Sequence, residues 1–212
     1  MKATWLGYSG LLLKNDKVNV LVDPHFEGAN DEIFNTQLDI ILLTHSHTQN
    51  LDIDCLGRFI ERQNKKVTIL AAKHAYLAVA EKFPTHNCVR MSPHSVWSVN
   101  DVTFYAVSTA HSEGSAVGFI IDDGEKTYYI TGDTLYNFDV IDDCLDLVST
   151  GVDVVFLPIS GEENNMNAQD AADFAYEIDA KLAVPIRLGS ANISDFDFDE
   201  VAVLTPFEES EI

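Results

Sequence analysis

The chain has 212 residues, of which 46% are hydrophobic and 10% aromatic, and its formal net charge is −21. This composition excludes a disordered chain, and no apolar run reaches the roughly 18 residues that a membrane-spanning helix requires. Because so acidic a protein repels nucleic-acid phosphates, we expect no nucleic acid as partner, and without a long apolar run we expect no membrane as partner.

The N-terminal sequence and the cysteines predict a cytoplasmic protein. Residues 1–5 lack the order of basic, apolar and small residues that marks a secretory signal. The cysteines are Cys55, Cys88 and Cys144. An odd number of widely spaced cysteines does not indicate a disulfide framework, so we expect reduced and mostly buried thiols.

The first half of the chain predicts several strands and two helices. Short apolar or β-branched runs between turn residues are typical of strands, and apolar positions at helical spacing are typical of helices. The predicted strands are residues 4–8, 11–14, 18–22, 39–43 and 67–71, and the predicted helices are residues 54–63 and 75–83.

The second half of the chain predicts further strands that alternate with helices towards the end. The predicted strands are residues 102–107, 116–121, 126–131, 153–157 and 182–186, and the predicted helices are residues 138–150 and 169–180. Asp123-Gly124 is typical of a hairpin turn, Gly151 is placed to end the first of these helices, and Asn167 is placed to cap the second. We expect the acidic tail beyond Asp195 to be loosely structured.

The order of these elements predicts an α/β fold in which two sheets pack face to face with helices outside. No repeat, low-complexity segment or linker interrupts the sequence. We therefore predict a single domain over residues 1–212.

The strongest chemical signal is the sequence Thr44-His45-Ser46-His47, which directly follows the apolar run 39–43. Two histidines in a loop at a strand end can aim both imidazoles at one point, and neutral imidazole is a favoured zinc ligand. Taken alone, two such histidines are more often ordinary surface residues, so the pair needs support from elsewhere in the chain.

Two further clusters follow predicted strands in the same way. His111 comes after the strand 102–107, and Asp133 comes after the strand 126–131, next to Gly132. Side chains at strand ends on one rim of a sheet can converge. These residues are therefore candidate partners of the two histidines.

Together these clusters resemble the metallo-β-lactamase-fold hydrolases, and in particular the branch of small hydrolases similar to ascorbate-6-phosphate lactonase. The motifs that carry the resemblance are Leu21-Val22-Asp23-Pro24, Thr44-His45-Ser46-His47, Ala110-His111-Ser112, Thr131-Gly132-Asp133-Thr134 and Leu157-Pro158-Ile159-Ser160-Gly161. Each motif is weak alone, but their order and spacing over nearly the whole chain are specific. The resemblance implies an αββα four-layer sandwich of two mixed sheets flanked by helices, with a metal site at the edge between the sheets.

The resemblance also implies a first metal site, whose residues in this chain are His45, His47, His111 and Asp133. All four are present. We therefore expect one zinc ion per chain, or another divalent metal ion in its place.

The family's second metal site is not intact in this sequence. The family signature H-x-H-x-D-H reads His45-Ser46-His47-Thr48-Gln49-Asn50, and Arg187 stands where the family usually has its last histidine. Gln49 and Asn50 are poor zinc ligands, and Arg187 stays protonated and cannot bind a metal. We expect Arg187 to supply one positive charge there and to form an ion pair with Asp133.

Two more residues are expected around the site. Asp23 resembles the family's structural aspartate, which would orient a ligand histidine through its other ring nitrogen, and capping of a turn is the open alternative. His25 replaces a residue that is usually apolar and is a candidate to line the pocket.

The leading hypothesis is a metal-dependent hydrolase of a small ester, lactone or phosphate-bearing substrate. This small-molecule substrate can carry a negative charge. Asp133 would orient a water molecule or act as general base, and Arg187, with Gln49 and Asn50, would stabilise a developing oxyanion or hold an anionic group. The alternative is a non-catalytic protein that binds a ligand or partner through the same pocket, because loss of one ion removes much of the positioning that hydrolysis needs. A nuclease is disfavoured by the acidic charge and the missing ligands.

Overall fold

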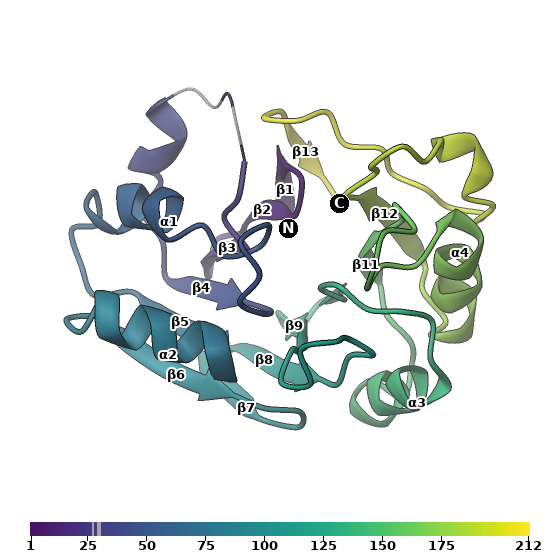
Figure 1. Cartoon of the computed structure of the whole chain (residues 1–212), viewed down its shortest axis with the longest axis horizontal. Coiled ribbons are helices and arrows are strands. Elements are labelled where there is room, and N and C mark those ends of the chain that lie inside the picture. Colours follow the sequence, from purple (N-terminus) through teal and green to yellow (C-terminus); the bar gives the residue numbers. More distant parts are fainter. Residues whose placement is uncertain (27, 29–30) are drawn as a thin grey trace. The chain divides into compact units, whose positions relative to one another are not determined.

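The computed structural model (Figure 1) describes residues 1–26, 28 and 31–212, and these residues divide into two compact units. The first unit comprises residues 1–91 and 204–212, and the second comprises residues 92–203. Among the described residues, no helix has both the length and the apolar character needed to cross a membrane. The single domain predicted over residues 1–212 stays a prediction.

The first unit is built on a mixed sheet with the strand order β13-β1-β2-β3-β4-β5-β6. Its strands are β1 (Lys2–Gly7), β2 (Gly10–Lys14), β3 (Asn19–Val22), β4 (Ile40–Leu43), β5 (Thr68–Ala72), β6 (Asn87–Met91) and β13 (Glu209–Glu211). Its helices are α1 (Ile53–Ile60), α2 (Lys73–Lys82) and the short 3-10 helix η1 (Asp31–Asn35). The pairs from β13 to β3 are antiparallel, and the pairs from β3 to β6 are parallel.

Strand β4 is an inner strand of the first sheet and lies between β3 and β5. All of its residues are buried, because parallel neighbours flank it on both sides and the sheet carries apolar groups on both faces. Helix α1 packs its buried residues Cys55, Leu56 and Phe59 into this core. Asp52 caps the helix by accepting hydrogen bonds from the backbone N–H groups of residues 54 and 55. A rigid, apolar strand therefore ends directly at the loop that carries Thr44-His45-Ser46-His47.

The second unit is built on another mixed sheet, with the strand order β12-β11-β10-β9-β8-β7. Its strands are β7 (Val96–Val99), β8 (Val102–Val107), β9 (Gly118–Asp122), β10 (Thr127–Ile130), β11 (Val154–Pro158) and β12 (Leu182–Ile186). Its helices are α3 (Phe138–Leu147), α4 (Ala168–Glu177) and the short 3-10 helix η2 (Ile193–Asp195). Strands β10, β11 and β12 run parallel to one another, whereas β7 to β10 are antiparallel.

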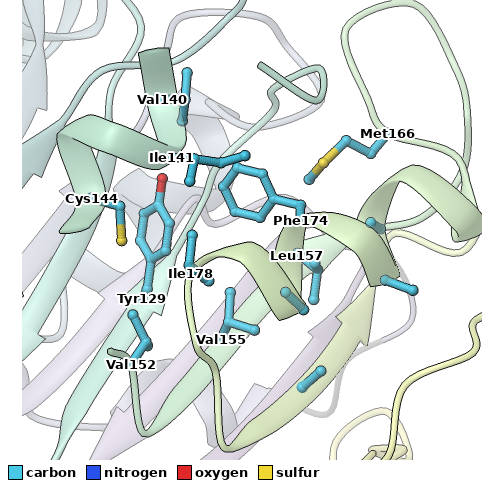
Figure 2. Close-up of a cluster of buried hydrophobic side chains, with 14 of the residues drawn as sticks. Tyr129, Val140, Ile141, Cys144, Val152, Val155, Leu157, Met166, Phe174 and Ile178 are labelled. Atoms are coloured by element: carbon cyan, nitrogen blue, oxygen red, sulfur yellow. The ribbon is translucent and has the colours of Figure 1, made fainter. Parts of the chain in front are cut away.

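The core of the second unit lies between its helices and its sheet. Figure 2 shows Ile141 from α3 and Phe174 from α4 gathered with Tyr129 and Val155 from the strands. Phe174 is fully buried, and removal of a buried phenylalanine ring typically lowers stability by about 3–5 kcal/mol. This packing holds the ends of the parallel strands in fixed positions.

All the predicted strands and helices form, within a few residues of their predicted ends. The helix predicted over residues 138–150 is shorter and ends at Leu147, whose next residue, Val148, caps it. Asn167 caps α4 as predicted, and its side chain accepts from the backbone N–H of Asp170. The cysteines are free, with Cys55 and Cys144 buried and Cys88 half-buried. The predicted α/β class with two mixed sheets and flanking helices is confirmed.

Three strands were not predicted, and each of them is the edge of its sheet: β6, β7 and β13. Most residues of these three strands are exposed or half-buried, so their apolar pattern is weak. The prediction of a loosely structured tail is wrong for Glu209–Glu211, which pair with β1. The strand pairs with β1 through its backbone, and Glu209 also makes ion pairs with Lys2 and Lys14.

Candidate metal site

The first unit brings two predicted ligands together in the loop after β4. His45 is buried and His47 is half-buried. Their ring centroids lie 5.0 Å apart, and the ring planes are nearly perpendicular at 86°. A separation of this size suits two imidazoles that bind a single ion.

Asp23 reaches His45 through Thr44. Asp23 follows β3 and Thr44 follows β4, and these two strands are parallel neighbours, so the sheet places both residues at the same edge. The carboxylate of Asp23 accepts from the backbone N–H of Thr44 (2.8 Å, to Oδ1) and from its hydroxyl group (2.5 Å, to Oδ2). The backbone of Asp23 has a φ of 38°, which is unusual for a residue other than glycine.

These contacts assign the tautomer of His45. The hydroxyl hydrogen of Thr44 points to Asp23, so the contact of 2.9 Å between Thr44 Oγ1 and His45 Nδ1 is a hydrogen bond donated by the ring. A neutral His45 with its proton on Nδ1 has a lone pair on Nε2. This is the form in which imidazole binds a metal ion, so the residue fits the predicted role.

The two amide residues of the degenerate signature have different environments. Asn50 is buried, and its side-chain amide donates to Asp23 Oδ2 at 3.1 Å. Gln49 is exposed, and its backbone carbonyl accepts from the hydroxyl group of Ser9 at 2.9 Å. Asn50 thus helps to hold Asp23 in place, and a role for either amide in stabilising an oxyanion stays a prediction.

The second unit gathers the other predicted residues at one edge of its sheet. Asp133 follows β10 and Arg187 follows β12, with the parallel strand β11 between them. The two side chains form a buried ion pair, which confirms the predicted pairing. Asn165, from the loop after β11, is also buried and donates to Asp133 Oδ2 at 3.4 Å.

The backbone after β12 is bent sharply to bring Arg187 to this place. Arg187 has a φ of 48°, a conformation that costs energy for any residue with a side chain. Gly189 follows with a φ of 55°, and a Cβ atom there would lie 2.9 Å from the Cβ atom of Ser160. The loop therefore needs glycine at 189 and keeps strain at 187, a combination that recurs at functional sites.

His111 lies between two residues that are tied to neighbouring loops. The backbone N–H of Ala110 donates to Thr134 Oγ1 (2.9 Å), and that of Ser112 donates to Asn164 Oδ1 (2.8 Å). His111 Nδ1 accepts from the backbone N–H of Glu113 (2.9 Å). A neutral ring in this arrangement carries its proton on Nε2, so metal binding by His111 requires this hydrogen bond to break or the ring to turn.

Asp143 is a supporting residue that the sequence did not reveal. It lies on α3 among the buried residues Val140, Ile141 and Cys144. Its Oδ2 atom accepts from the backbone N–H of Ser108 at 2.6 Å, three residues before His111. A carboxylate on the apolar face of a helix was the available signal, because such a group is buried only when it is hydrogen-bonded.

The backbone N–H of His25 donates to the carbonyl group of Asp23, whereas its ring contacts Tyr8 and Asp52. Its ring packs edge-on against Tyr8, with 5.3 Å between the ring centroids, and its Nδ1 atom lies 3.7 Å from Asp52 Oδ2. Together with Tyr8, Phe26 and Phe207 it lines a cavity of the first unit.

Comparisons with known proteins identify a family. A profile described as the beta-lactamase superfamily domain matches residues 2–187. The chain is also similar to the UPF0173 metal-dependent hydrolase MK1542 from Methanopyrus kandleri, at 26% identity over 209 residues, which covers 90% of this chain and 85% of that protein.

Two solved structures share the fold. Igni18, a metallo hydrolase from Ignicoccus hospitalis, has a TM-score of 0.82 at 19% identity and covers 99% of this chain and 97% of its own. YhfI from Bacillus subtilis, a metallo-β-lactamase fold protein, has a TM-score of 0.74 at 19% identity and covers 99% of both chains. These similarities confirm the predicted metallo-β-lactamase fold.

Proposed function

The chain belongs to the β-lactamase superfamily, and on this premise we propose that it is a metal-dependent hydrolase that works with one divalent ion, zinc in the first place. The observation that carries the proposal is the buried ion pair of Asp133 with Arg187. In the metallo-β-lactamase-fold hydrolases that the sequence resembles, the aspartate at this position bridges two ions. Here a guanidinium group neutralises it, which supports a site with a single ion.

The ligands of the ion would be His45, His47 and His111, with Asp133 as the fourth ligand or as a neighbour. Three imidazoles are the ligand chemistry that zinc favours, and the tautomer of His45 already suits it. When bound, a zinc ion supplies Lewis acidity and lowers the pKa of a coordinated water molecule to about 7 in well-built sites.

The residues of the chain would supply the remaining chemistry. Asp133 would accept a proton from water or orient it, and the hydrogen bond from Asn165 would hold the carboxylate in position. Arg187 would give a permanent positive charge that stabilises an oxyanion or binds an anionic group of the substrate. Small esters, lactones and phosphate-bearing molecules are the substrates for which this arrangement is suited.

Metal content and hydrolysis, measured together, test the proposal. Protein purified without chelators should contain a divalent metal ion and hydrolyse members of a panel of esters and lactones. His45→Ala should lose both properties, whereas His74→Ala, at an exposed histidine, should keep them. A metal-free wild-type protein with no activity after zinc is added would contradict the proposal.

A non-catalytic, ligand-binding protein is the second candidate. The observation that favours it is again the engagement of Asp133 by Arg187 and Asn165, which occupies the carboxylate oxygen atom that a hydrolase would use to hold water. Ligand binding without turnover, in protein that carries its metal, would identify this alternative.

A further inference from the structure

A cavity in the first unit lies outside the predicted metal ligands. Its volume is about 420 Å³, and four rings line it: Tyr8, His25, Phe26 and Phe207. The segments that meet there are the turn after β1, the segment after β3 and the turn before β13. A volume of this size accommodates part of a small molecule.

The rings of the cavity are arranged in two edge-to-face pairs. Tyr8 and His25 have centroids 5.3 Å apart at 77°, and Phe26 and Phe207 have centroids 5.9 Å apart at 71°. Edge-to-face contact is a geometry that aromatic pairs prefer, so a further aromatic group can pack against these rings in the same way. Tyr8 and Phe207 are 37% and 38% exposed, so the cavity offers apolar surface that the fold does not use for its own core.

Two of these rings belong to residues with a strained backbone. Tyr8 has a φ of 53° and Phe207 has a φ of 65°, in the left-handed region that bulky residues rarely adopt. The carbonyl group of Tyr8 accepts from the indole N–H of Trp5 at 2.9 Å, and the backbone N–H of Phe207 donates to the carbonyl group of Trp5 at 2.8 Å. Trp5 is therefore hydrogen-bonded to both strained residues.

The cavity is connected to the loop of His45 and His47 within the same unit. The backbone N–H of His25 donates to the carbonyl group of Asp23 at 2.8 Å, and Asp23 in turn binds Thr44. On the other side, Ser9, next to Tyr8, donates to the carbonyl group of Gln49. A molecule bound in the cavity would thus lie beside the loop that carries two predicted ligands.

We propose that this cavity binds a neutral aromatic ring, which forms the apolar part of the substrate. The assignment of the ring to a substrate rests on the proposed function, whereas binding of the ring itself does not. Edge-to-face ring pairs favour an aromatic group over an aliphatic group of equal size. A quaternary ammonium group is the competing occupant, because aromatic side chains also bind cations.

The chain contains its own reporter for this test. It has two tryptophans, and Trp5 touches the cavity residues while Trp97 belongs to the second unit. Their indole N–H signals can be followed separately by ¹H–¹⁵N NMR during titration with benzyl alcohol. We expect benzyl alcohol to shift the signal of Trp5 in a saturable manner and to leave that of Trp97 unchanged.

Probes of similar size and matched variants test whether the cavity prefers a neutral aromatic ring. Benzyl alcohol should bind at least three-fold more tightly than cyclohexylmethanol and than benzyltrimethylammonium. Phe207→Ala and Phe207→Leu should each weaken the binding of benzyl alcohol at least five-fold. The Leu variant retains much of the side-chain volume, so it tests the proposal even if the Ala variant disturbs the fold. Phe138→Ala, at an exposed phenylalanine of the second unit, should have no effect. No saturable shift of Trp5, or tighter binding of either competing probe, would overturn the proposal.

Hydrolysis gives an independent readout. If the protein hydrolyses esters, Phe207→Leu should raise the KM for phenyl acetate and leave that for ethyl acetate unchanged. Ring binding without any hydrolysis would contradict the proposed function but support the proposal that the cavity binds an aromatic ring. Hydrolysis without ring binding would support the proposed function and contradict the proposed ring site.

Discussion

Arg187 and Asp133 form an ion pair in which the two side chains are only 6% and 5% exposed. Burial of two charges is tolerated when they are paired and hydrogen-bonded, and Asn165 supplies a further donor. Arg187 and the amides Gln49 and Asn50 replace three expected ligands of a second ion. The first-site residues are all kept, which is why we interpret the site as one that holds a single ion.

Removal of Arg187 should leave the carboxylate of Asp133 buried without its partner. We expect Arg187→Ala to lower the free energy of unfolding by about 3–5 kcal/mol, measured by urea denaturation. Arg187→Lys should lose less, because it keeps the charge but not the planar donor group. Arg90→Ala, at an exposed arginine of β6, is the control. A loss within about 0.5 kcal/mol, the range usual for surface substitutions, would show that the pair does not stabilise the fold.

The hydroxyl group of Thr44 should be needed for metal binding, since it links Asp23 to His45. Thr44→Val keeps the shape of the side chain but removes the hydroxyl group, so we expect metal affinity to fall about 10–100-fold. Thr44→Ser keeps the hydroxyl group and should bind nearly as tightly as the wild type. Competition with a coloured chelator measures both values, and equal affinity of the Val variant would exclude this link.

Asp143 should stabilise the segment that leads to His111. In Asp143→Ala the backbone N–H of Ser108 loses its acceptor, and we expect a loss of about 1–3 kcal/mol in the free energy of unfolding. Asp143→Asn retains an acceptor oxygen and should recover most of this loss. Similar losses for the two variants would indicate that the charge, and not the hydrogen bond, is what matters.

The cysteines should react slowly with thiol reagents. Burial raises the pKa of Cys55 and of Cys144 to about 12, and it also raises the pKa of Cys88. Because the thiolate is the reactive form, a raised pKa lowers its fraction at pH 8 and lets the rate increase as the pH rises. We expect alkylation at pH 8 to modify half-buried Cys88 first, and Cys55 and Cys144 only in denaturant. Rapid modification of Cys144 in the native protein would contradict the burial of this thiol.

The sequence predicted those parts of the fold whose pattern is local. The four apolar residues of β4 identify a buried strand by themselves, and the polar side chains just after it identify the loop. Because strands β10, β11 and β12 are parallel, residues that follow them, such as Asp133 and Arg187, meet at one edge. The ion pair itself was expected from the family resemblance, in which Arg187 stands where a ligand of the second ion would be.

Features that depend on contacts between distant residues were not predictable in this way. Strand β13 forms through β1 and through ion pairs of Glu209 with two lysines near the other end of the chain. Asn165 and Asp133 are 32 positions apart, and Asp143 and Ser108 are 35 positions apart. No periodicity in the sequence records such pairs, because each depends on how loops from separate strands meet.

The number of metal ions per chain tests the central claim most directly. Elemental analysis should find about one divalent ion per chain in the wild type and about two in the triple variant Gln49→Asp, Asn50→His, Arg187→His, which restores the family ligands. Two ions in the wild-type protein, or a single ion in the triple variant, would contradict the account.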